Sequence, residues 1–496
     1  MVGIVVDQLR TDYVEYLKEL FGEKGFRQLM QKGVFIRDLD FRRSADDAAA
    51  ATAVLYTGNW PSANGVPSAG IYDPTTKRSL PAMLPADAGA SSGKYSPEAL
   101  RLSTIADEIA IDGAGLAAVY SVAADPQQAV IMTGHAGTSA AWIDDNNARW
   151  AGSSYYTDFP QALQRINQFN PLSRRLDTLQ WKPSRPLSEY PGLPGQKKYY
   201  PFRHSFYTND RNAVRRFKTA APVNDVVTDA AIEIIKSRNL GKRGDAIDMI
   251  NLAYTAAPYK ESADGDFRVE LEDTYLRLDA QLGRLLDEID RNVGLDNTLV
   301  YLASTGYYDD ATVDDPKYRI PGGEFSLKRA ESLLNAYLSA KYGNADFIDA
   351  IHDGQVYIDR RAVEQRGQRI DAVRADAREF MSKMSGVAGA YTLSEVLAGD
   401  NPDISYLALS VDPKTCGDVF LTFFPGWTVK DDISYPPTDY PVRYGQVLTP
   451  GFILWPALEA TTIDTPVEAV TLAPTITSNL HIRSPNGALR RPLPLK

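Results

Sequence analysis

The chain has 496 residues, of which 44% are hydrophobic and 23% are charged, and its net charge is −10 at pH 7. This composition is ordinary for a globular protein and excludes a disordered, collagen-like or coiled-coil chain. An acidic chain without a long run of lysine and arginine is not expected to bind nucleic acid. No apolar stretch approaches the roughly 18 residues that a membrane-spanning helix needs. The single cysteine, Cys416, excludes an internal disulfide framework.

Short apolar strands alternate with helices along the chain. Residues 2–6 form an apolar run that ends at Asp7 and predicts a buried strand. Residues 97–111 predict a helix, and residues 269–293 place apolar side chains three or four positions apart, as one face of a long helix does. Residues 299–303 predict another buried strand. This alternation predicts an α/β fold whose central, mostly parallel sheet carries helices on both faces.

Two stretches interrupt the alternation. Residues 151–220 are rich in tyrosine, proline, arginine and serine, so we expect an irregular insertion there. Residues 310–400 carry helices and a strand of their own and predict a smaller inserted lobe. The core is then expected to comprise residues 1–309 and 401–496. The proline-rich tail after residue 460 is expected to lie along the surface.

Carboxylates follow two of the predicted strands, and sites of parallel sheets form where strands end. Asp7 follows the first strand, where a carboxylate suits a hard cation, although a capping aspartate or one paired with Arg10 explains it equally well. Asp309 and Asp310 follow the strand 299–303, where such a pair binds a cation or simply lines a solvated turn. Together the three carboxylates define a weak, oxygen-only cation site.

The chain contains few histidines. The four histidines, His135, His204, His352 and His481, are scattered along the chain. Imidazole is the usual nitrogen ligand of zinc, so a site with several zinc ions would need most of these side chains in one place. A histidine that stands alone is more often a hydrogen-bonded structural group than a metal ligand.

Several longer motifs are distinctive. They are V-V-D-Q-L-R at 5–10, Y-T-G at 56–58, G-H-A at 134–136, E-D-T-Y-L-R-L-D at 272–279 and P-G-W at 425–427. With these motifs the chain resembles the alkaline phosphatase superfamily nearly end to end. Within it, the chain is similar to the type I phosphodiesterase/nucleotide pyrophosphatase branch and to the secreted monomeric alkaline phosphatases of Bacteroidota.

The resemblance implies a chemistry in which two zinc ions clamp an in-line phosphoryl transfer to a threonine or serine nucleophile. Carried over by position, the first metal ligand is Asp7, whereas the nucleophile position holds Ala48. The remaining ligand positions hold Pro258, Ser262, Thr305, Gly306 and Leu448. On this count the nucleophile and all ligands except Asp7 are lost.

We therefore expect a pseudoenzyme, a catalytically inactive protein without a cofactor. It would serve as a binding or assembly component of the bacterial envelope, with another envelope protein as its partner. The chain shows no signal peptide, but members of the family are mostly exported. A periplasmic or cell-surface location is the resulting expectation.

Two alternatives stay open. The first is a diverged, metal-dependent phosphoric ester hydrolase that uses the carboxylate-only site of Asp7, Asp309 and Asp310. The second is a glycan- or peptide-binding module that uses the old cleft. Its candidate lining consists of the aromatic segments Tyr155-Tyr156, Tyr199–Arg203 and Tyr435–Tyr440.

Overall fold

The computed structural model describes residues 1–85, 92–193, 201–244, 246–259, 268–309, 322–434, 438–443 and 445–496. These residues form two compact units. The first comprises residues 1–66, 83–308 and 447–496, and the second comprises residues 67–82 and 309–446. None of the helices in the described ranges is both long enough and apolar enough to cross a bilayer.

The first unit is built on a nine-stranded sheet. In spatial order its strands are β21 (Thr461–Ile463), β2 (Val34–Ile36), β20 (Gly451–Leu454), β12 (Val300–Ser304), β1 (Val2–Asp7), β11 (Met249–Thr255), β6 (Val119–Ala123), β7 (Ser139–Ile143) and β8 (Trp150–Gly152). The strands from β12 to β7 run parallel, and β20 and β8 pair antiparallel on either side of them. The expected α/β fold with a mostly parallel sheet is confirmed.

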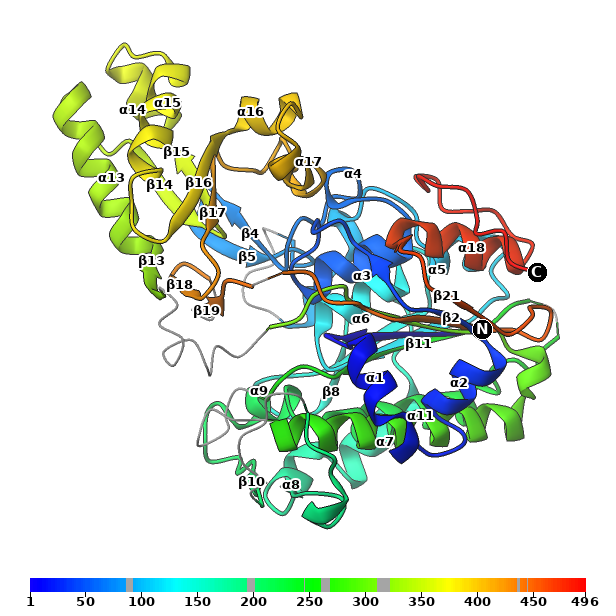
Figure 1. Ribbon diagram of the computed structural model, residues 1–496. Helices are drawn as coiled ribbons and strands as arrows, with labels where there is room; N and C mark the ends of the chain where they lie inside the picture. The colour runs from blue at the N-terminus through cyan, green and yellow to red at the C-terminus, as the bar shows by residue number, and fades with distance from the viewer. Residues whose placement is uncertain are drawn as a thin grey trace. The chain divides into compact units, whose positions relative to one another are not determined.

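Helices cover both faces of this sheet (Figure 1). One face carries α3 (Ala48–Thr57), α5 (Ile105–Asp112), α6 (Pro126–Thr133) and α18 (Leu472–Asn479). The other carries α1 (Thr11–Leu17), α2 (Phe26–Lys32), α7 (Gln161–Phe169), α10 (Pro222–Arg238) and α11 (Arg268–Asn292). Because both faces are covered, residues 2–6 of β1 are all buried, which explains their continuous apolar run.

The long helix α11 has the apolar stripe that its sequence predicts. Leu278, Leu282, Leu285 and Ile289 are at most 2% exposed and belong to the main hydrophobic core. These positions lie three or four residues apart and therefore face the sheet together. The helix ends before Gly294, whose positive φ of 89° suits glycine.

The predicted helix at 97–111 begins later than expected. Thr104 caps α5, because its hydroxyl accepts from the Asp107 N–H (3.2 Å) while the Asp107 carboxylate accepts from the Thr104 N–H (2.8 Å). This capping box fixes the first turn at Ile105 and leaves only a short 3₁₀ turn at Pro97–Ala99 upstream.

The sequence predicts that the tail after residue 460 lies along the surface, but the structure places parts of it in the sheet and the core. Strand β21 pairs parallel with β2 and so forms an edge of the central sheet. Leu472, Ala473 and Ile476 of α18 are at most 1% exposed. The few apolar residues of the tail are therefore placed where they reach the core.

The second unit contains three sheets. The hairpin β4 (Gly70–Asp73) and β5 (Arg78–Pro81) is separate from a four-stranded sheet of β14 (Ile348–His352), β15 (Gln355–Ile358), β17 (Val419–Phe423) and β16 (Val387–Thr392). The third sheet joins β13 (Gly323–Ser326), β18 (Trp427–Asp431) and β19 (Thr438–Pro441). The helices α13 (Leu327–Tyr342) and α15 (Ile370–Met381) pack against each other and share one core with the four-stranded sheet and the sheet of β13, β18 and β19.

This unit differs in extent from the lobe expected at 310–400. Strand β17 lies between β15 and β16, so residues beyond 400 complete the sheet of the lobe. Residues 67–82 also cluster with it, although they come from a distant part of the chain. The lobe boundaries at 310 and 400 stay a prediction about which part folds independently.

The stripe of α11 gives a test of the core. We expect Leu282→Ala to lower the free energy of unfolding by about 3 kcal/mol, because it removes a fully buried side chain and leaves a cavity. Arg291→Ala on the same helix removes an exposed arginine, and its partner Glu288 keeps an ion pair with Lys236, so the expected cost is less than about 1 kcal/mol. Urea unfolding followed by tryptophan fluorescence measures both variants. Equal losses would contradict this placement of the stripe.

Candidate active site

Three parallel strands end at the same edge of the central sheet. In the register of β1 with its neighbours, Asp7 pairs with Thr255 of β11 and Val6 pairs with Ser304 of β12. The residues that follow these strands therefore meet, as they do at the sites of other parallel sheets. Asp7 lies on the central strand of the three.

Asp7 is held by two hydroxyl groups. Its Oδ1 atom accepts from the Thr305 hydroxyl at 3.0 Å and from the Tyr307 hydroxyl at 2.6 Å. Thr305 also accepts from the backbone N–H of Gln8 at 2.9 Å, and its side chain is buried. The segment after β12 thus fixes both the carboxylate and the turn that follows β1.

The backbone turns sharply directly after Asp7. Gln8 has a φ of 58°, in the left-handed region that residues other than glycine rarely occupy. The Ser304 hydroxyl donates to the Leu9 carbonyl at 2.7 Å, and the Arg10 N–H donates to the Tyr275 hydroxyl at 2.9 Å. Such a conformation persists only where its surroundings hold it, as they do here.

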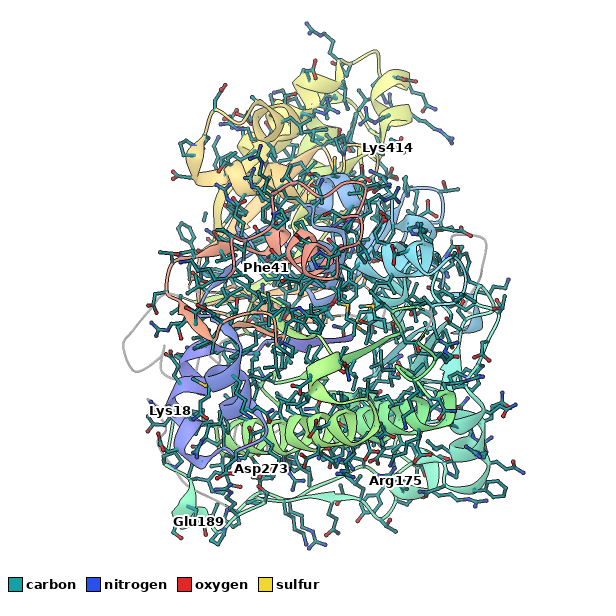
Figure 2. All side chains as sticks on the ribbon, turned by 90° about the vertical axis from the view of Figure 1, so that its right-hand side faces the viewer. Lys18, Phe41, Arg175, Glu189, Asp273 and Lys414 are labelled. Atoms are coloured by element: carbon teal, nitrogen blue, oxygen red, sulfur yellow. The ribbon has the colours of Figure 1, made fainter. Side chains whose placement is uncertain are left out.

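The predicted ligand position at Gly306 is closed by an aromatic ring. Gly306 has a φ of 80°, and a Cβ built on it would lie 2.0 Å from the ring of Phe41, which Figure 2 labels. A side chain at this position would therefore require movement of Phe41 as well as a strained backbone. Only glycine fits the present arrangement.

The other implied positions are spread over several elements. Ala48 is the first residue of α3, and Pro258 is buried after the end of β11. Leu448 is 45% exposed, and its carbonyl accepts from the Thr11 N–H at 2.9 Å, so it anchors the start of α1. Ser262 lies outside the described residues.

The predicted oxygen-only site is described only in part. Asp309 belongs to the second unit, where its carboxylate accepts from Arg443 Nη2 at 2.9 Å and from Nε at 3.1 Å. Asp310 lies outside the described residues. The joint site of Asp7, Asp309 and Asp310 therefore stays a prediction.

The aromatic segments are likewise described in part. Tyr156 is buried, and its hydroxyl donates to the Gly134 carbonyl at 2.7 Å, whereas Tyr155 is 43% exposed. Residues 199–200 and 435–437 lie outside the described ranges. The binding module that these segments would line stays a prediction.

The side chains at the implied ligand positions do not fit a pair of zinc ions. In the described ranges, no three or more histidine, cysteine, aspartate or glutamate side chains converge so that they could hold a metal ion. Proline, glycine and leucine offer no side-chain donor, and a threonine hydroxyl is a poor zinc ligand. No reaction step is therefore assigned to zinc.

Comparison with known proteins gives full-length matches. The model of the family "Type I phosphodiesterase / nucleotide pyrophosphatase" matches residues 1–452. The alkaline phosphatase PafA of Elizabethkingia meningoseptica is 25% identical, over 99% of this chain and 93% of its own length. The alkaline phosphatase PhoV of Synechococcus elongatus is 23% identical, over 99% and 91%. The crystal structure of wild-type PafA superimposes with a TM-score of 0.84 at 24% identity, over 99% of this chain and 98% of that one.

These matches confirm the resemblance and correct two expectations. The prediction that the protein is not an enzyme is wrong, because the family is hydrolytic and its relatives are named alkaline phosphatases. The prediction that it has no cofactor is also contradicted, because these phosphatases belong to a metal-dependent group. Both expectations came from carrying ligand positions over by count, and one of those positions, Ser262, lies outside the described ranges.

Placing a histidine at Gly306 tests the geometry of this edge. We expect Gly306→His to lower the free energy of unfolding by at least about 3 kcal/mol, because overpacking adds to backbone strain. Gly115→His is the matched control, since Gly115 has a similar φ of 86° with nothing within 4 Å of the added Cβ. It is expected to cost only about 1–2 kcal/mol. Similar losses in the two variants would show that Phe41 does not close the site.

Proposed function

Because the chain belongs to the type I phosphodiesterase/nucleotide pyrophosphatase family, we propose that it is a hydrolase of phosphoric esters. The observation that carries this proposal is the full-length match to relatives named alkaline phosphatases, which spans 99% of the chain. The fold supports it as well, since it keeps a carboxylate at the end of the central strand β1. The substrates are expected among phosphate monoesters and diesters.

Phosphoryl transfer makes particular demands on such a site. The transferred group carries charge on its equatorial oxygens, so catalysis depends on positioning and on compensation of that charge. Asp7 offers a carboxylate that Thr305 and Tyr307 hold in one orientation. We propose that a hard divalent cation, such as Mg²⁺ or Mn²⁺, binds there through oxygen ligands.

The proposed setting is the bacterial envelope. The resemblance to exported phosphatases supports a periplasmic or cell-surface location, and another envelope protein is the expected partner. Fractionation of the native host followed by immunodetection tests the location, and recovery of the protein only with the cytoplasm would contradict it.

Hydrolysis is tested with the purified full chain. We expect release of nitrophenol from p-nitrophenyl phosphate or bis-p-nitrophenyl phosphate in the presence of Mg²⁺, Mn²⁺ or Zn²⁺, and loss of this activity with a chelator. Asp7→Asn is expected to lower kcat/KM by at least about 100-fold, because it weakens the binding of the cation. Asp7→Asn is assayed side by side with the wild type over a range of pH.

The matched control is Asp287→Asn on the outer side of α11. Asp287 is an aspartate paired with the exposed Lys24, so its loss is expected to leave hydrolysis unchanged. Absence of hydrolysis of both substrate classes with every cation would overturn the proposed function. Hydrolysis that survives Asp7→Asn unchanged would move the site away from Asp7.

A further inference from the structure

A serine, a histidine and an aspartate form one hydrogen-bonded chain in the second unit. Ser79 lies on β5, His352 ends β14 and Asp431 ends β18. The Ser79 Oγ atom lies 3.1 Å from Nε2 of His352, and Nδ1 of His352 lies 2.7 Å from Oδ2 of Asp431. The three residues are between 2% and 6% exposed. None of them belongs to the edge of the central sheet.

The aspartate at the end of this chain is firmly held. Its Oδ2 accepts from the backbone N–H of Asp353 at 3.1 Å, and its Oδ1 accepts from the N–H groups of Ile433 (3.1 Å) and Ser434 (3.3 Å). Burial alone would raise the pKa of Asp431, but the hydrogen bond from His352 and the backbone donors outweigh it and keep the pKa below its ordinary value. Asp431 is therefore a fixed, ionised acceptor for Nδ1–H.

The second ring nitrogen of His352, Nε2, faces the hydroxyl group of Ser79. With Nδ1–H donated to Asp431, Nε2 of neutral His352 accepts from the Ser79 hydroxyl. The Gly70 carbonyl lies farther from Nε2, at 3.4 Å. This order of atoms is the one that activates a serine nucleophile, since the histidine takes the proton while the carboxylate orients the ring.

The two other paired histidines do not share this arrangement. Nε2 of His135 faces the Leu100 carbonyl at 3.0 Å, and Nε2 of His204 faces the Glu270 carboxylate at 3.0 Å. Neither contact offers a nucleophilic hydroxyl. The arrangement around His352 is thus specific among these pairs and is not a general feature of buried histidines in this fold.

We propose that Ser79, His352 and Asp431 form a second reactive centre, in which Ser79 accepts the acyl group of small carboxylic esters. The Ser79 Oγ atom bonds to the ester carbonyl carbon while its proton passes to Nε2 of His352. The bond from that carbon to the alcohol oxygen then breaks, and the alcohol leaves with this proton. Water attacks the acyl-serine with His352 as base, and the proton returns to Oγ as the carboxylic acid is released.

The hairpin limits the size of the acyl group. Ser79 follows the turn at residues 74–77 and Arg78, all of them exposed, and an ester is expected to approach from this side. On the opposite strand, a Cβ added to Gly70 would lie 2.6 Å from Ser79 Oγ. A side chain at residue 70 would therefore collide with the nucleophile, and the surroundings of Ser79 Oγ are tight. Acetyl-sized groups are the expected substrates.

The test uses the full chain and a fluorophosphonate probe, with the modified residue identified by peptide mass spectrometry. We expect modification of Ser79, at a rate that His352→Gln and Asp431→Asn each lower by at least about 100-fold. Ser96 is the matched control, because it is also buried and its Oγ has no hydrogen-bond partner among the described residues. It is expected to stay unmodified.

The rate of modification is expected to rise with pH. Burial lowers the pKa of His352, but the hydrogen bond to Asp431 and the charges of Asp353 and Asp431 outweigh it and raise the pKa above its ordinary value. The groups that face His352 are Asp431, Asp353, Ser79 and the Gly70 carbonyl. Because only neutral His352 can take the serine proton, reactivity increases as pH passes this raised pKa.

Two results would overturn the proposal. One is a folded wild-type protein whose Ser79 does not react with the probe, and the other is Ser79 that reacts equally fast in His352→Gln. Either result would mean that the hydrogen bonds among Ser79, His352 and Asp431 have only a structural role. Ser79→Ala also separates this centre from the proposed phosphoric ester hydrolysis, because it is expected to abolish release of nitrophenol from p-nitrophenyl acetate and to leave release from p-nitrophenyl phosphate unchanged.

Discussion

The parallel pairing of β1 with two neighbours is the constraint on which the candidate site depends. Because β11 and β12 run in the same direction as β1, the residues after all three strands reach one edge of the sheet. Thr305 and Tyr307 can therefore donate to Asp7 from about 300 positions away along the chain. A half-buried carboxylate at the end of a parallel strand needs such donors, and here the segment after β12 supplies them.

The same edge shows which contacts fill the fold around Asp7. The core residues of β1 and α11 pack as a parallel α/β sheet requires, and the likeness to PafA extends over nearly the whole chain. At the ligand positions, Gly306 lies against Phe41 and Leu448 anchors α1, so each has a packing or backbone role in this fold.

The sequence predicted the scaffold better than the site. The apolar run before Asp7 and the stripe of α11 follow from simple periodicities, and the structure has both. The contact of Tyr307 with Asp7 and the closure of Gly306 by Phe41 could not be predicted, because no local pattern encodes a contact across hundreds of residues. The hydrogen bonds that join Ser79, His352 and Asp431 were missed for the same reason. Inactivity was inferred from side chains counted by position, and the relatives correct it.

The central claim is that Asp7 anchors a cation at which phosphoric esters are hydrolysed. Anomalous diffraction from crystals of the full chain soaked in Mn²⁺ tests it most directly. The account predicts a manganese peak about 2.0–2.6 Å from an oxygen of Asp7, with further oxygen ligands around it. A well-ordered Asp7 that contacts only the hydroxyls of Thr305 and Tyr307, with no peak beside it, would contradict the claim.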